Sequence, residues 1–108
     1  MRWTVEFVSR VAEQEVNALP EDMRSRFARI AQLIQDRGLM SVREPYVKHI
    51  DGKLWEMRLS GKAGIARSIY VAASGQRVLV LRTFIKKTEK TPQGEIESAL
   101  ARLKEILR

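Results

Sequence analysis

The chain has 108 residues, with 20 Lys plus Arg against 13 Asp plus Glu, a formal net charge of +7 and 44% hydrophobic residues. This length fits one domain, residues 1–108, and so high an apolar fraction excludes a disordered chain. Because there is no cysteine and only one histidine, His49, disulfide frameworks, iron–sulfur clusters and multi-histidine metal sites are excluded. We therefore expect no metal and no cofactor.

The apolar runs are short and the N-terminus is polar. No run approaches the roughly 18–20 residues that a membrane span needs. Glu6 stands where a signal peptide would keep its apolar region. We therefore expect a cytoplasmic protein with no membrane partner.

The first forty residues predict a strand followed by two helices. Residues 2–8 alternate apolar and polar side chains, with Trp3, Val5 and Phe7 on one side, which is typical of a half-buried strand. Ser9 is a candidate N-cap, and Pro20 suits the first turn of the second helix. The apolar positions are Val11, Ala12, Val16 and Leu19 in the first helix, and Met23, Phe27, Ile30 and Ile34 in the second, which we expect to end at Gly38.

The remainder predicts an antiparallel meander and a closing helix. Strands are expected over residues 46–50, 54–59, 65–72 and 77–85, separated by short turns such as Asp51-Gly52 and Ser74-Gly75. Thr91-Pro92 opens a last helix whose apolar stripe is Ile96, Leu100, Leu103 and Leu107. The predicted fold class is α+β: an N-terminal strand and helical hairpin packed on an antiparallel sheet of about four to five strands, with a C-terminal helix. We expect helices to cover one sheet face and the other face to be at least partly open.

The positive charge is concentrated in the middle of the chain. Residues 43–90 hold eleven basic side chains against four acidic ones, whereas residues 1–42 and 91–108 are each balanced. A basic solvated surface would explain this excess, but its segregation is also typical of a protein with a phosphate-bearing partner. We take an anionic partner as the working hypothesis.

Several of these basic residues interrupt apolar strand faces. Arg82 follows Val78 and Val80 at period two, and Arg67 lies between Ile65 and Ile69. A buried guanidinium is costly unless it is paired, for example with Glu56, or reaches water. The alternative is convergence on one site with Arg58, Lys86 and Lys87, surrounded by further candidate substrate-binding lysines, namely Lys48, Lys53 and Lys62.

Such a cluster suits phosphate chemistry. Arginine and lysine hold phosphate and stabilise the charge that develops in phosphoryl transfer. In RNA the 2′-hydroxyl already lies beside the phosphorus, so cleavage needs orientation, proton transfer and charge neutralisation. Within the basic segment, His49 and Glu56 are the candidates for proton transfer, and Glu56 equally suits orienting an arginine.

Four segments resemble the HigB-type, phage Gp49-like branch of the RelE/ParE toxin superfamily. They are residues 54–60 (LWEMRLS), 66–71 (ARSIYV), 80–88 (VLRTFIKKT) and 90–92 (KTP). The resemblance implies a small basic toxin of a type II toxin–antitoxin system, held inactive by a cognate antitoxin of helix-turn-helix type. It also implies metal-independent cleavage of messenger RNA (mRNA) on the ribosome. After Pro92 the chain lacks the tyrosine of RelE-like members and the histidine and aspartate of some HigB-like members.

The resemblance also implies roles for individual residues. The positions that match the family's basic site are Arg58, Arg67, Arg82, Lys86 and Lys87. Arg67 and Arg82 would hold the scissile phosphate, and Lys86 or Lys87 would neutralise charge or assist proton transfer. Two alternatives stay open: a ParE-like toxin that acts on DNA gyrase by protein contacts, and a nucleic-acid-binding module without catalysis.

Overall fold

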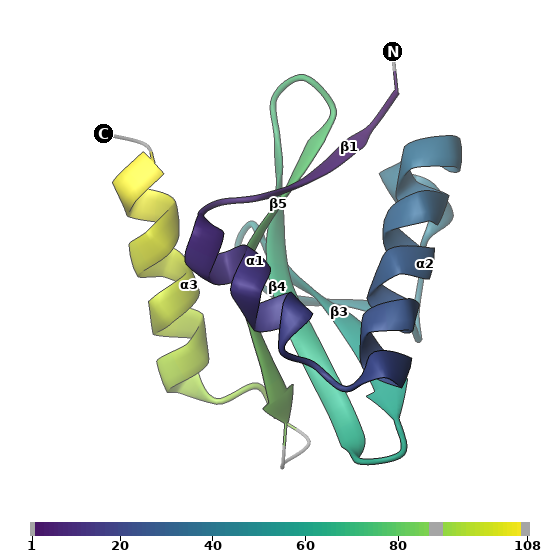
Figure 1. Ribbon diagram of the computed structural model, residues 1–108. Helices are drawn as coiled ribbons and strands as arrows, with labels where there is room; N and C mark the ends of the chain where they lie inside the picture. The colour runs from purple at the N-terminus through teal and green to yellow at the C-terminus, as the bar shows by residue number, and fades with distance from the viewer. Residues whose placement is uncertain (1, 87–89, 107–108) are drawn as a thin grey trace.

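In the computed structural model, residues 2–86 and 90–106 are described, and they form one five-stranded sheet with three α-helices (Figure 1). In chain order the elements are β1 (Thr4–Phe7), α1 (Arg10–Asn17), α2 (Glu21–Arg37), a short 3-10 helix (Leu39–Ser41), β2 (Val47–Asp51), β3 (Leu54–Gly61), β4 (Gly64–Ala73), β5 (Arg77–Lys86) and α3 (Gln93–Ile106). Within these residues no helix is both long and apolar enough to cross a bilayer.

The sheet has the order β1-β5-β4-β3-β2. Strands β2 to β5 form the predicted antiparallel meander, which confirms the α+β class. β1 instead runs parallel to β5, with Thr4 opposite Arg77 and Phe7 opposite Val80, so the sheet is mixed. No tight turn joins these two strands, so local sequence does not fix their relative direction.

The helix boundaries follow the expected capping residues. Ser9 caps α1, because its Oγ accepts a hydrogen bond from the Ala12 N–H at 3.2 Å. Gly38 ends α2 with a φ of +88°, a conformation that favours glycine. Pro20 occupies the N-cap position of α2 rather than its first turn.

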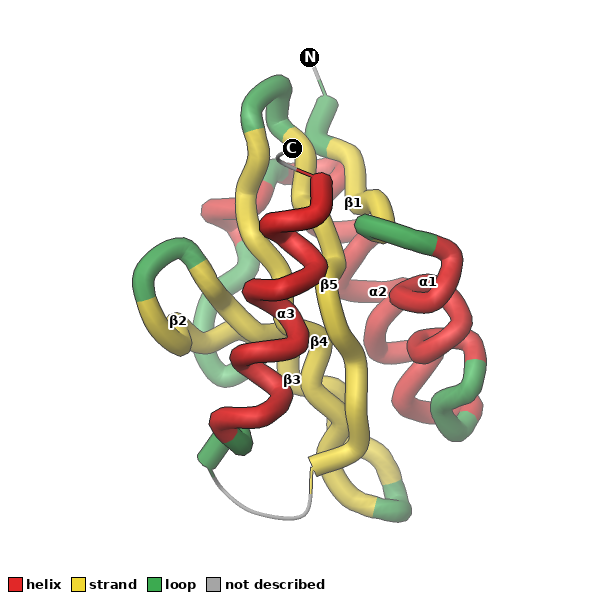
Figure 2. The backbone as a smooth tube through the Cα atoms, turned by 90° about the vertical axis from the view of Figure 1, so that its left-hand side faces the viewer, coloured by secondary structure: helices red, strands yellow, loops and turns green. Residues whose placement is uncertain are grey.

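Helices cover both faces of the sheet, so the expectation that they would cover only one was wrong. Figure 1 shows α2 and α3 on opposite sides of the sheet, with α1 across its β5 edge. Figure 2 looks onto the face that carries α3, which packs on β5 and β4. All four residues of the predicted α2 stripe join Val78 and Val80 in one core, whereas Leu79 and Leu81 join Ile96 of α3 in the other. The near-continuous apolar run from Val78 to Leu81 is typical of a strand buried on both faces.

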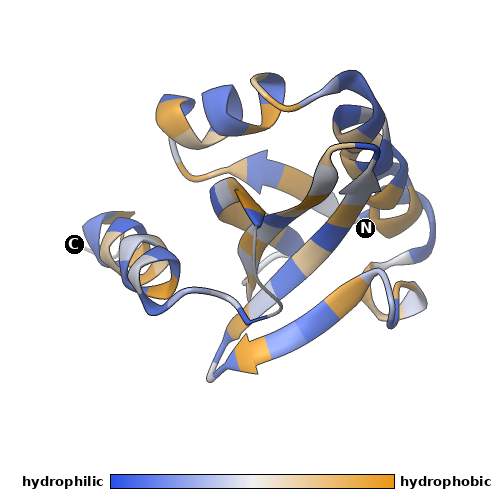
Figure 3. Cartoon of the chain, turned by 90° about the horizontal axis from the view of Figure 1, so that it is seen from below, coloured by the Kyte–Doolittle hydropathy of each residue, from blue (hydrophilic) through white to orange (hydrophobic). Residues whose placement is uncertain are grey.

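Figure 3 shows hydrophobic and hydrophilic residues alternating along parts of the ribbon. Two predicted core positions lie at the surface. Val11 of α1 is 52% exposed and Leu100 of α3 is 39% exposed. Ala99 takes the buried position beside Ile96 on α3. The last position of the predicted α3 stripe, Leu107, lies outside the described residues.

A β-bulge in β5 changes the face on which Arg82 lies. Ile69 is opposite Arg82, but the next residue, Tyr70, is opposite Val80, so Leu81 is the extra residue in β5. A bulge shifts the two-residue alternation and moves all later side chains to the other face. The expectation that Arg82 shares a face with Val78 and Val80 was therefore wrong.

The edge of β5 beyond β1 is closed by Glu15 of α1 and Arg102 of α3. The Thr83 N–H donates to Glu15 Oε1 at 3.2 Å, and Arg102 Nη1 donates to the Leu81 carbonyl at 2.8 Å. Glu15 also accepts hydrogen bonds from Arg82 and Arg102. These contacts satisfy backbone groups that a bare strand edge would leave unpaired, and they fasten α1 and α3 to β5. We call them the edge clamp.

Glu15 is ionised in this clamp more readily than a free glutamate. Burial raises the pKa of its carboxyl, but the hydrogen bonds from Arg102 and the Thr83 N–H and the charge of Arg82 outweigh burial, so the net pKa is lowered. A lowered folded-state pKa adds stability above the ordinary pKa of 4.5, and this contribution is lost as pH falls through the folded-state value.

We therefore predict that Glu15→Gln lowers the free energy of unfolding at pH 7 by about 1–3 kcal/mol, because a charged acceptor for buried donors is lost. The variant should also lose less stability than the wild type on acidification below pH 4.5. Urea unfolding followed by circular dichroism over a pH series measures both effects. Glu13→Gln, at an exposed position on the same helix, is the control. Equal effects of the two substitutions would contradict the assigned role of Glu15.

Candidate functional site

Three basic side chains from adjacent strands lie on the face of the sheet that carries α3. Arg58 of β3 is directly opposite Arg67 of β4, which is in turn opposite Phe84 of β5. Lys86 lies two residues beyond Phe84 and therefore on the same face. Arg67 is 2% exposed and Lys86 is 7% exposed, whereas Arg58 is partly buried. We call Arg58, Arg67 and Lys86 the cationic cluster.

Glu56 lies on this face beside the cluster and is itself 1% exposed. Its carboxylate forms an ion pair with Arg67 Nη1 and accepts a hydrogen bond from the Thr91 hydroxyl, just before α3. Burial lowers the pKa of the Arg67 guanidinium, and the adjacent carboxylate favours its charged form. Glu56 thus fixes the position of Arg67 and links β3 to the segment that leads into α3.

Arg82 lies on the same face, opposite Ile69, but two carboxylates hold it. Its Nε donates to Glu95 Oε1 at 2.8 Å, and its Nη1 forms an ion pair with Glu15. The hydrogen bond that Arg82 donates to Glu95 raises the pKa of Arg82, an effect that burial opposes and Glu15 reinforces. The guanidinium therefore belongs to the edge clamp and contributes little net charge to the cluster.

Lys48 and Arg58 border the part of this face next to β2. Lys48 is opposite Glu56, so it lies on the cluster's face, where it is exposed. The Arg58 N–H donates to the Tyr46 carbonyl at 2.8 Å, which holds the chain before β2 against β3. Arg58 Nε has no hydrogen-bond partner among the described residues.

The remaining predicted residues lie elsewhere. His49 is opposite Trp55 on the other sheet face, where its Nε2 is 2.8 Å from the Gly52 carbonyl oxygen and its ring packs edge-on against Trp55. Lys53 lines an apolar groove beside Trp55, on the α2 side of the sheet. Lys87 lies outside the described residues. The structure thus does not bring His49 or Lys53 to the cationic cluster.

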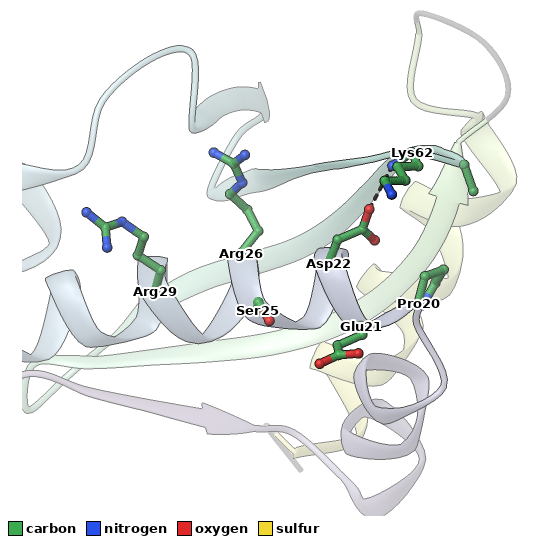
Figure 4. Close-up of a pocket in the computed structure, with 8 residues that line it drawn as sticks. Pro20, Glu21, Asp22, Ser25, Arg26, Arg29 and Lys62 are labelled. Atoms are coloured by element: carbon green, nitrogen blue, oxygen red, sulfur yellow. Dashed lines mark hydrogen bonds between the residues drawn. The ribbon is translucent and has the colours of Figure 1, made fainter.

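Lys62 belongs to a second basic surface, beside α2. Its N–H donates to Asp22 Oδ2 at 2.7 Å, so Asp22 fastens the β3–β4 turn to the first turn of α2. Arg26 and Arg29 lie along α2 and line the same open hollow of about 880 Å³ as Lys62 (Figure 4). Sequence analysis missed these two arginines because residues 1–42 have no net charge. Their three-residue spacing, outside the apolar stripe, was the available signal.

Among residues 2–86 and 90–106, no group of three His, Asp or Glu side chains could hold a metal ion.

The family model described as "Phage derived protein Gp49-like (DUF891)" matches residues 14–104. The chain belongs to this Gp49-like family. That membership confirms the resemblance inferred from the motifs of β3, β4 and β5. No curated protein matches this Gp49-like chain in sequence.

Two solved structures of RelE proteins have a similar fold. The RelE–RelB complex from Pyrococcus horikoshii OT3 superposes with a TM-score of 0.62 at 18% identity, over 81% of this chain and 98% of that one. A double arginine variant of the E. coli toxin RelE in the free state gives a TM-score of 0.66 at 13% identity, over 95% of this chain and 99% of that one. At these identities the likeness establishes the RelE fold.

We predict that Glu56→Leu lowers the free energy of unfolding by about 3–5 kcal/mol, because it leaves the buried Arg67 charge without its carboxylate. The double variant Glu56→Leu/Arg67→Met removes both charges and should recover most of that loss. Urea unfolding of the wild type, both single variants and the double variant gives the coupling free energy. A double variant as unstable as the sum of the single variants would contradict the ion pair's importance.

Proposed function

We propose that this Gp49-like protein is the toxin of a type II toxin–antitoxin system and cleaves mRNA bound to the ribosome. One observation carries the nuclease assignment: Arg58, Arg67 and Lys86, from three adjacent strands, share one sheet face. Cations fixed on rigid strands are suited to stabilise charge that grows on a phosphate. Family membership and the RelE fold support the toxin assignment.

The proposed reaction needs no nucleophile beyond the RNA. The ribose 2′-oxygen attacks phosphorus as its proton leaves, the bond from phosphorus to the 5′-oxygen breaks, and the 5′-oxygen takes up a proton. The products are a 2′,3′-cyclic phosphate and a 5′-hydroxyl. The cationic cluster neutralises the non-bridging oxygens, which carry the developing negative charge.

The geometry supports a different role for each group of predicted residues. Arg58 and Lys86 contact the phosphate. Arg67, whose position Glu56 holds, keeps a positive charge between them. Lys87 follows Lys86 directly and adds positive charge for the transition state, and Lys48 at the cluster's border binds the substrate backbone. Arg82 is a positioning residue, because Glu15 and Glu95 occupy its guanidinium. His49 has no part in proton transfer in this scheme, since it lies on the opposite sheet face.

The partners follow from the same proposal. The ribosome presents the mRNA in the cytoplasm, and a cognate antitoxin, of helix-turn-helix type, keeps the protein inactive. The similar fold in the RelE–RelB complex supports an antitoxin as a protein partner. Since the chain carries a net charge of +7, we expect an acidic antitoxin segment to cover its basic surface.

The two alternatives make different requirements of the cluster. A toxin that acts on gyrase by protein contacts has no need for cations from three strands on one sheet face. A module that only binds nucleic acid needs positive charge, but not a carboxylate such as Glu56 that fixes one buried guanidinium. The arrangement therefore favours the nuclease.

We predict that Arg58→Ala lowers mRNA cleavage on ribosomes by about 100-fold or more, because one donor to the transition-state phosphate is lost. Arg77→Ala is the matched control, since this exposed arginine lies at the opposite end of β5 and should leave cleavage unchanged. Primer extension on mRNA recovered from purified ribosomes measures both. Cleavage by Arg58→Ala at the wild-type rate would remove the site assignment. Gyrase-dependent DNA breaks without mRNA cleavage would support the ParE-like alternative.

A further inference from the structure

The edge of β3 is open beside the cationic cluster. β2 pairs with β3 only as far as Met57, which lies opposite Val47. Beyond this point, Pro45 and Tyr46 border the strand edge and leave a cavity of about 340 Å³. It is lined by Arg26, Pro45, Tyr46, Arg58, Ser60 and Ile65. The cavity therefore combines residues of α2, the segment before β2, β3 and β4.

The lining has a distinct chemical character. Tyr46 is 46% exposed, so the apolar core does not use its ring fully. Arg26 and Arg58 bring two guanidinium groups from different elements, Ser60 adds a hydroxyl, and no carboxylate is among the lining residues described. An aromatic surface next to paired guanidinium groups suits a ligand with a flat ring and a phosphate. The volume lies within the roughly 300–1,000 Å³ of small-ligand sites.

Arg58 connects this cavity to the proposed site of cleavage. It lines the cavity and is also directly opposite Arg67 in the cationic cluster. Arg26 in turn lines both this cavity and the hollow that it shares with Arg29 and Lys62 (Figure 4). Basic side chains thus extend from the cluster around the edge of β3 to the outer side of α2, where Glu21 and Asp22 also line the hollow.

We propose that this cavity is a nucleotide subsite: it holds the RNA nucleotide adjacent to the scissile phosphate, with the base stacked on Tyr46 and the phosphate between Arg26 and Arg58. The inference rests on the proposed function and places the RNA nucleotide next to the cleavage site. Tyr46 acts in positioning and touches no reacting atom. Stacking tolerates different bases, so the subsite favours a nucleotide without selecting a particular one.

The test uses the full chain and a 2′-O-methyl tetranucleotide, which cannot be cleaved because its 2′-oxygens are blocked. We expect Tyr46→Ala to weaken binding about tenfold, since it removes one stacked base, and Tyr46→Phe to stay within about twofold because the ring remains. Trp55→Ala, an exposed aromatic on the other sheet face, is the control. Fluorescence anisotropy gives the affinities, and urea unfolding checks that each variant is folded.

A series of tetranucleotides with one abasic position locates the contact. At the stacked position, the missing base should weaken binding to the wild type about tenfold but add no loss for Tyr46→Ala. The proposed subsite is wrong if the loss from the missing base and the loss from Tyr46→Ala multiply at every position. It is also wrong if Tyr46→Ala binds like the wild type. If the wild type cleaves mRNA on ribosomes, the proposed function survives that result. A wild type that neither binds the tetranucleotide nor cleaves mRNA overturns both.

Discussion

The buried ion pair between Glu56 and Arg67 is the constraint on which the candidate site depends. Arg58 and Arg67 lie directly opposite each other on adjacent strands, an arrangement in which like charges repel. Glu56 lies two residues before Arg58 on the same face of β3, and its negative charge offsets that repulsion. The Thr91 hydroxyl donates to the same carboxylate, so the position of Arg67 is linked to the start of α3. One buried glutamate therefore allows two arginines to occupy neighbouring strands.

The second ionic assembly, the edge clamp, has a different physical role. Arg82 and Arg102 are both bound to Glu15, and Glu15 and Arg102 form hydrogen bonds with the β5 backbone where β1 leaves its edge open. The clamp holds α1 and α3 on either side of the strand that carries Lys86. Neighbouring arginines of this fold thus have either a structural or a ligand-binding role, depending on which carboxylates each one contacts. The sequence motif does not show this division, because both kinds of arginine interrupt apolar strands alike.

Periodicity predicted most of the fold because local side-chain patterns govern helices, strands and turns. Ser9, Gly38 and Asp51-Gly52 marked boundaries correctly, since capping and turn formation depend on adjacent residues. The placement of α3 on the second face depended on burial of both sides of β5, and the bulge at Leu81 depended on pairing with β4. Neither is encoded within one strand. Arg82 pairs with Glu15, which is 67 residues away in the chain, a separation at which no prediction from residue spacing applies.

Much of the candidate site could likewise be predicted from the sequence, but not which of the candidate residues belong to it. Arg58, Arg67 and Lys86 converge because the meander brings their strands into register. His49 was separated from them by the alternation of β2, which places Lys48 and His49 on opposite faces. Arg26 had no signal in the charge distribution, because balancing acidic residues occupy the same segment. Its proximity to Arg58 arises from the packing of α2 beside the open edge of β3.

The most direct measurement of the central claim is a nuclear magnetic resonance titration of the ¹⁵N-labelled protein with an uncleavable RNA, followed through the arginine Nε–H signals. We expect the signals of Arg58 and Arg67 to shift together as RNA binds, while that of Arg77 at the far end of β5 stays unchanged. Shifts confined to arginines outside the cationic cluster, with Arg58 and Arg67 unmoved at saturation, would contradict it.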